Sequence, residues 1–175
     1  MDFSVLSPTA LVASLMVAAT PIMLAAIGEL IVEKAGVLNL GVEGMMIVGA
    51  VLGFITAIET GSAWLGLLGA IIGGMLISLI FAILTQLLLA NQVASGLALT
   101  LFGLGLSSMV GNSYTGLKPP AFNSIEIPIL SDIPFIGAAI LNHDPVVYIG
   151  LLIVTVVYYF LNKTNKGLIL KAVGE

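Results

Sequence analysis

Long apolar runs separated by short polar connections dominate the pattern of this chain. Most of these runs are apolar on every side, whereas a surface helix of a water-soluble domain is apolar along one stripe only. About 20 apolar residues are enough to cross a hydrocarbon core of ~30 Å as a helix. The pattern therefore predicts an all-α protein, a polytopic bundle of transmembrane helices.

We expect about five spans, with approximate bounds at residues 9–32, 37–58, 64–89, 93–110 and 145–161. The first carries Pro21, and its missing amide hydrogen bond predicts a kink. Polar residues and glycines interrupt the second run near 37–45, which predicts a discontinuous helix there.

Small residues recur at a spacing of four in three of these runs, at Gly49 and Gly53, at Gly69 and Gly73, and at Gly103, Ser107 and Gly111. Residues four apart share one face of a helix, and small side chains on that face let two helices approach closely. The face with Ser107 in particular is predicted to pack against another helix.

Composition narrows the possible functions. Hydrophobic residues make up 59% of the 175 positions and charged residues 8%, with a net charge of -4 and no basic surface that could bind nucleic acid. The absence of cysteine excludes disulfides and thiolate chemistry, and a single histidine, His143, makes neither a metal site nor an acid–base pair. We therefore expect no catalytic residue, metal or cofactor, and no enzymatic activity in this chain.

The distribution of lysines predicts how the chain is oriented in the membrane. Three of the five lysines follow the last span, so the positive-inside rule places the tail after residue 161 in the cytoplasm. The proline-rich region 111–144 is then an external loop. Counting back through five spans places the amino terminus outside, whereas a re-entrant segment at 37–58 would place it inside.

Five charged or polar side chains lie close to the first two apolar runs: Glu29, Glu33, Lys34, Asn39 and Glu43. Such groups sit at the membrane interface, face a bundle interior or line a pathway. Glu29 and Glu33 fit the interfacial end of a helix or an ion site. Asn39 and Glu43 fit a substrate pathway, or they cap the ends of a broken helix.

Four blocks carry a family resemblance: GELIVEKAGVLNLGVEGMMIVGA, NQVASGLALTLFGLGLSS, IPILSDIPFIG and TNKGLILKAVGE. In this order, they resemble the permease subunits of bacterial ATP-binding-cassette importers of the simple-sugar and nucleoside type. These permeases are related to those for branched-chain amino acids and ribose. Members of that family continue well beyond the last block, so we expect residues 1–175 to be the amino-terminal part of a transmembrane permease domain.

The resemblance implies translocation of nucleosides or simple sugars by alternating access in a multi-pass protein of the bacterial inner membrane. The implied partners are cytoplasmic ATPase subunits, a second permease subunit that is a different but related chain, an external substrate-binding protein and the lipid bilayer. Residues 162–175 resemble the start of the cytoplasmic coupling loop. The residues on its pattern, implied to contact the ATPase, are Gly167, Lys171, Ala172, Gly174 and Glu175, with Lys171 where arginine is usual.

Two alternatives come from other classes of protein. An ion- or proton-coupled secondary transporter or channel would use Glu29, Glu33 and Glu43 as intramembrane sites. A membrane scaffold would contain no pathway. The odd number of spans and the block at 164–175 favour the importer over the secondary transporter.

Overall fold

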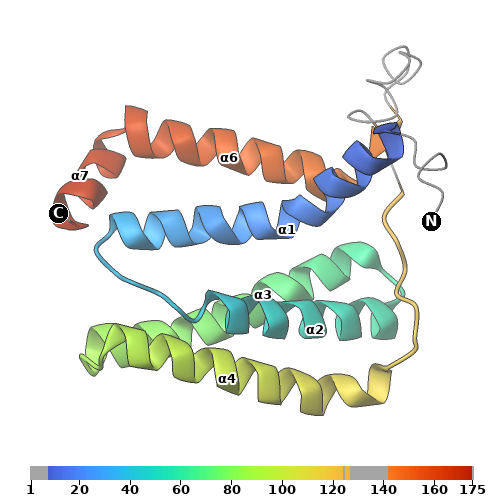
Figure 1. The fold of residues 1–175 in the computed structure, drawn as a ribbon, viewed down its shortest axis with the longest axis horizontal. Coiled ribbons are helices and arrows are strands. Elements are labelled where there is room, and N and C mark those ends of the chain that lie inside the picture. Colours follow the sequence, from blue (N-terminus) through green and yellow to red (C-terminus); the bar gives the residue numbers. More distant parts are fainter. Residues whose placement is uncertain (1–7, 124, 127–141, 175) are drawn as a thin grey trace. The chain divides into compact units, whose positions relative to one another are not determined.

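The computed structural model describes residues 8–123, 125–126 and 142–174 of the chain. Helices dominate these residues (Figure 1): α1 (Pro8–Lys34), α2 (Val42–Thr60), α3 (Ala63–Ala82), α4 (Gln92–Gly111), α6 (Pro145–Lys163) and α7 (Asn165–Gly174). A π-helical turn, Ile83–Leu87, continues α3, and a short 3-10 helix, Asn112–Tyr114, follows α4.

The prediction of an all-α bundle with about five spans is confirmed. Within the described ranges, five helices are long and apolar enough to cross a membrane: Pro8–Lys34, Val42–Thr60, Ala63–Leu87, Gln92–Tyr114 and Pro145–Lys163. One small addition is an antiparallel pair of two-residue strands, β1 (Ile125–Glu126) and β2 (Asn142–His143). Residues 124 and 127–141 of the predicted external loop lie outside the described residues.

The chain divides into two compact units. The first comprises Met1–Ile31 and Phe122–Val173, and the second comprises Val32–Ala121 and Gly174–Glu175. The second unit contains α2, α3 and α4, and the first contains most of α1 together with α6 and most of α7.

In the second unit, α2 and α3 pack through small residues. A Cβ atom added to Gly53 would lie 2.8 Å from the Cβ of Ala70, and one added to Gly73 would lie 3.2 Å from the Cα of Gly49. The two glycine pairs that the sequence singled out therefore lie in one interface, as expected for a motif that lets helix backbones approach.

The same helix, α2, packs against α4 through another pair of glycines. A Cβ atom on Gly103 would lie 2.7 Å from the carbonyl oxygen of Gly44, so no side chain fits between the two backbones. This contact confirms that the small-residue face of α4 packs against another helix. Next to it lies a buried apolar cluster, formed by Val48, Ile77, Phe81 and Leu99.

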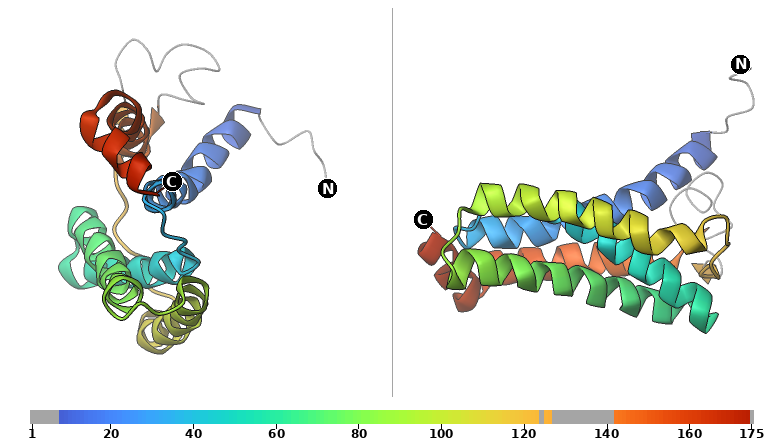
Figure 2. Two further views of the ribbon diagram at one scale, coloured as in Figure 1. Left: turned by 90° about the vertical axis from the view of Figure 1, so that its left-hand side faces the viewer. Right: turned by 90° about the horizontal axis from the view of Figure 1, so that it is seen from below.

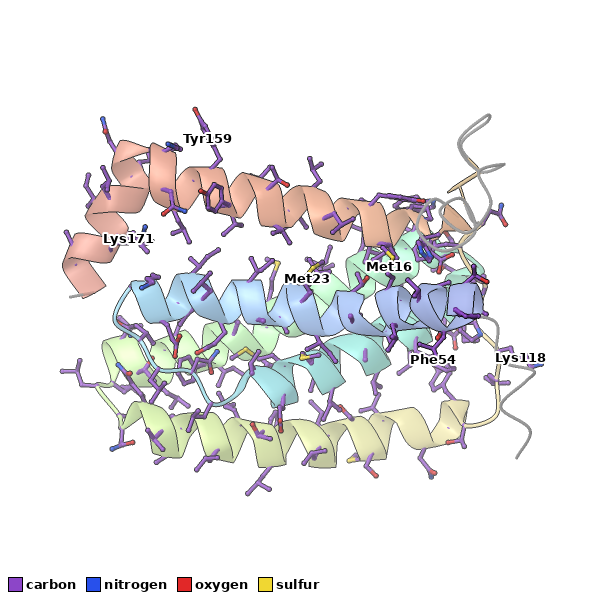
Figure 3. All side chains as sticks on the ribbon, turned by 45° about the horizontal axis from the view of Figure 1, so that its top comes forward. Met16, Met23, Phe54, Lys118, Tyr159 and Lys171 are labelled. Atoms are coloured by element: carbon purple, nitrogen blue, oxygen red, sulfur yellow. The ribbon has the colours of Figure 1, made fainter. Side chains whose placement is uncertain are left out.

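In the first unit, α1 bends along its length (Figure 2), as Pro21 predicted. Proline supplies no amide hydrogen, so the carbonyl of Val17 lacks its usual helical donor, and the neighbouring Thr20 hydroxyl donates to the carbonyl of Met16 at 2.8 Å. Met23 of α1 lies on the side of α6 (Figure 3), where its Cε atom would be 3.1 Å from a Cβ on Gly150.

The contact between α2 and α4 gives a stability prediction. We expect Gly103→Ala to lower the free energy of unfolding by about 1–3 kcal/mol, because the added methyl group meets backbone atoms of α2 that cannot turn aside. Thermal unfolding in detergent, followed by circular dichroism, measures the change.

The matched control is Gly105→Ala, two residues further along the same helix. Nothing lies within 4 Å of a Cβ at Gly105, so this change should leave stability unaltered or raise it by up to about 1 kcal/mol through helix propensity. Equal effects of the two substitutions would contradict the close contact at Gly103.

Candidate functional site

The chain breaks its helical course between α1 and α2, in the stretch that carries Asn39. The break begins at Gly36, whose φ of 80° is left-handed and favours glycine. The amide of Gly36 donates to the carbonyl of Glu33 at 2.9 Å, and the amide of Val37 donates to that of Val32 at 3.2 Å. This pair of bonds is a Schellman motif, which ends α1 while satisfying its last carbonyl groups.

Asn39 forms the hydrogen bonds at the other end of the break, just before α2. Its side chain is buried, with 7% exposed, and its Oδ1 atom accepts a hydrogen bond from the amide of Gly41 at 2.9 Å. Its Nδ2 atom donates to the sulfur of Met45 at 3.6 Å. The first of these bonds is the local turn that asparagine side chains favour, and it directly precedes the first residue of α2.

Helix α4 holds the stretch between these two ends. The amide of Leu38 donates to Oε1 of Gln92 at 2.8 Å, and the hydroxyl of Thr100 donates to the carbonyl of Leu40 at 3.0 Å. Backbone groups outside a helix find no hydrogen-bond partners within their own segment. The two α4 side chains supply such partners to Leu38 and Leu40 and so stabilise the break.

Asn39 and Glu43 lie in different environments. Glu43 is exposed in the first turn of α2, where a negative charge is favoured by the helix dipole. The predicted discontinuity near 37–45 is thus shorter than expected, since residues 42–45 are already helical. The start of α2 accordingly combines one buried amide with one exposed carboxylate.

A tight elbow joins α6 to α7, the stretch expected to contact an ATPase. Gly167 is buried, and a Cβ there would meet the carbonyl oxygen of Phe160 and lie 2.8 Å from the Cα of Leu161. The amide of Gly167 donates to the hydroxyl oxygen of Thr164 at 3.1 Å, which caps the first turn of α7. Glycine at 167 is therefore required for the two helices to meet.

Lys171 strengthens the elbow from α7 (Figure 3), where its Nζ atom donates to Oδ1 of Asn162 at 2.9 Å. Ala172 is exposed, and Gly174 is the last residue of α7. Glu175 lies outside the described residues. The large apolar side chains of α7 that are exposed are Leu168, Ile169 and Val173.

The glutamates proposed for an ion site do not form a cluster of three or more. Glu33 is exposed near the end of α1, whereas Glu29 is partly buried one turn earlier. Among the residues that the structure describes, no group of three or more His, Asp or Glu side chains could hold a metal ion. Asn39, in contrast, makes hydrogen bonds to both the Gly41 amide and the Met45 sulfur.

Sequence reasoning missed Gln92, Gly96 and Thr100, which contact the break from α4. Their spacing of four was the available signal, because it extends the small-residue face at 103–111 toward the start of the helix. A partner 54 or 60 residues away cannot be read from local spacing, and this is why the contact was not predicted.

These features define a polytopic membrane protein with an interrupted backbone before its second span and a short helix after its last described span. The family model for the branched-chain amino acid transport system / permease component matches residues 11–175. The chain belongs to this family. Its description as a permease component agrees with the expectation that the chain is not itself an enzyme.

Curated relatives are similar over most of this chain. The putative glucose ABC transporter permease protein TsgC13 of Haloferax volcanii is 43% identical over 162 residues, which are 90% of this chain and 49% of the relative. The guanosine ABC transporter permease protein NupQ of Bacillus subtilis is 34% identical over 179 residues, 94% of this chain and 56% of the relative.

A third relative, the nucleoside ABC transporter permease protein NupC of Lactococcus lactis, is 30% identical, again over 94% of this chain and 56% of its own length. The chain thus spans about half the length of these relatives. The search of solved structures found no match.

The cap of α7 can be tested directly. Thr164→Val should remove the acceptor for the Gly167 amide and destabilise the first turn of α7 by about 0.5–2 kcal/mol. Hydrogen exchange at the Gly167 amide would then become faster. Thr164→Ser keeps the hydroxyl and should exchange at the original rate, and equal rates in the two variants would refute the cap.

Proposed function

We propose that this chain is a pore-forming permease subunit of an ATP-binding-cassette importer for nucleosides or simple sugars. Family membership carries the proposal, supported by three relatives named as glucose, guanosine and nucleoside permeases. The chain supplies transmembrane helices, and separate cytoplasmic subunits hydrolyse ATP. An external binding protein delivers substrate, and a second, related permease subunit completes the pathway in the cell membrane.

The mechanism that fits these parts is alternating access. ATP binding drives the permease from one opening to the other only if ATP binds the two conformations with different affinity. The permease therefore needs one element that contacts the ATPase and a second element near the substrate pathway that changes conformation when ATP binds. We assign the first role to α7 and the second to the break before α2.

Three properties of α7 support its role as the contact with the ATPase. It follows the last described span through a tight elbow, so movement of α7 is transmitted to α6 rather than absorbed by a loose linker. Its exposed apolar side chains offer a surface that a partner protein can cover. Lys163, Lys166 and Lys171 also support a cytoplasmic position for this end of the chain, by the positive-inside rule.

The break before α2 supports the second role. Buried Asn39 and exposed Glu43 lie on either side of the first residue of α2. Amide and carboxylate groups are suitable hydrogen-bond partners for the hydroxyl groups of a sugar or nucleoside. Asn39 also accepts a hydrogen bond from the Gly41 amide, so it has a structural role at the start of α2 beside the proposed role in the pathway.

Uptake assays on the complete permease test this assignment. Asn39→Ala and Glu43→Gln should each lower uptake of a radiolabelled sugar or nucleoside about tenfold or more, because polar contacts made in the pathway are lost. The amounts of protein in the membrane must be equal. Normal uptake at normal expression would rule out both residues as part of the pathway.

A second test addresses α7. Ala172→Asp should abolish most of the ATPase stimulation by substrate-loaded binding protein in proteoliposomes, since it introduces a charge into the proposed contact. Asn165→Asp adds the same charge at the exposed first residue of the same helix and should leave stimulation near the original level. Equal stimulation in both variants would contradict the contact at Ala172.

A further inference from the structure

The stretch 37–41 has no regular structure, yet α4 fixes it at two backbone positions. One bond joins the Leu38 amide to Gln92 at 2.8 Å, and the other joins the Leu40 carbonyl to Thr100 at 3.0 Å. Both are bonds from side chain to backbone, and neither is part of a helix. They can therefore break without unwinding α2 or α4.

The backbone of α4 forms the floor beneath this stretch. A Cβ on Gly96 would lie 2.8 Å from the Leu40 amide nitrogen and 2.9 Å from that of Gly41. Residues 92, 96 and 100 are four apart and lie on one face of α4. Two hydrogen-bonding side chains thus flank a glycine that lets the stretch lie directly on the helix.

We propose that Gln92 and Thr100 are positioning residues, which hold the stretch 37–41 against α4, and that transport requires this hold. The inference rests on the proposed function. Neither side chain is assigned to bind substrate. Together they fix the backbone on both sides of Asn39, and so they fix where its side chain meets the pathway.

A non-helical stretch is well defined only while partners of its backbone groups hold it in one arrangement. The Schellman motif defines one end and the Asn39 turn defines the other, whereas Leu38 and Leu40 rely on α4. Loss of either α4 bond leaves a polar group with no partner in place. The stretch then populates arrangements in which Asn39 is displaced.

The experiment uses two matched pairs of variants in the complete permease, assembled with its partner subunits. Gln92→Met and Thr100→Val remove the bonding atoms while nearly preserving side-chain volume. Gln92→Glu and Thr100→Ser preserve the acceptor and the donor. Each variant is examined by thiol labelling and by uptake.

Thiol labelling reads the position of the stretch without relying on transport. This chain contains no cysteine, so Val37→Cys introduces one partly buried thiol within the stretch. The probe is N-ethylmaleimide, and mass spectrometry of the peptide that contains residue 37 gives the labelling rate. Ala57→Cys, at a site 6% exposed where α2 packs against Gly66 of α3, is the control for general loosening.

We expect Gln92→Met and Thr100→Val each to accelerate labelling of Val37→Cys about fivefold, the effect of losing one ordinary hydrogen bond. Labelling of Ala57→Cys should not change. The same two variants should lose most of their uptake at equal expression, while Gln92→Glu and Thr100→Ser should retain both the slow labelling and the uptake.

Three results would overturn the inference: an unchanged labelling rate at residue 37, equal acceleration at residue 57, or faster labelling with full uptake. A wild-type permease that took up none of the tested sugars or nucleosides would instead contradict the proposed function. In that case the labelling rates would still decide whether the two side chains hold the stretch.

Discussion

A backbone that leaves its helix within an apolar chain must find partners for its amide and carbonyl groups, and the connection between α1 and α2 is built around this requirement. The last turn of α1 bonds to Gly36 and Val37, Asn39 bonds to Gly41, and α4 supplies partners for Leu38 and Leu40. These bonds hold the connection in one arrangement although it has no helical pattern of its own.

Glycine makes these bonds possible by letting backbones approach. At Gly96 the stretch rests on α4, and at Gly103 the backbone of α2 lies close to the same helix. The interface between α2 and α3 uses the same device at Gly53 and Gly73. Because lipid gives helices no hydrophobic reason to associate, close backbone contact and hydrogen bonding provide much of the specificity of such a unit.

Much of the fold follows from the sequence, because long apolar runs have few ways to satisfy their backbones other than as spanning helices. The bounds of the spans, the bend at Pro21 and the small-residue interfaces follow from local spacing. The π-helical turn at Ile83–Leu87 does not, since no residue there marks a change of hydrogen-bonding pattern. The paired strands β1 and β2 were also missed, because two-residue ladders carry no periodic signal.

The candidate site was only partly predictable. Asn39 and Glu43 could be selected from the sequence because polar groups are rare in it, and Gly167 and Lys171 because of the family resemblance. The hydrogen bonds of Asn39 with Gly41 and of Lys171 with Asn162 could not be predicted from the sequence. The bonds of Gln92 and Thr100 could not be predicted either, because residues far apart in the sequence meet only when the helices pack.

We propose that a separate ATPase drives transport through this chain, and its native complex shows whether this is so. The tagged protein is purified by affinity from its own membranes in mild detergent, and the retained proteins are identified by mass spectrometry. We expect an ABC ATPase subunit and a second permease subunit in the complex. Recovery of the protein without any ATPase, from membranes in which an ion gradient alone drives uptake, would refute the proposal.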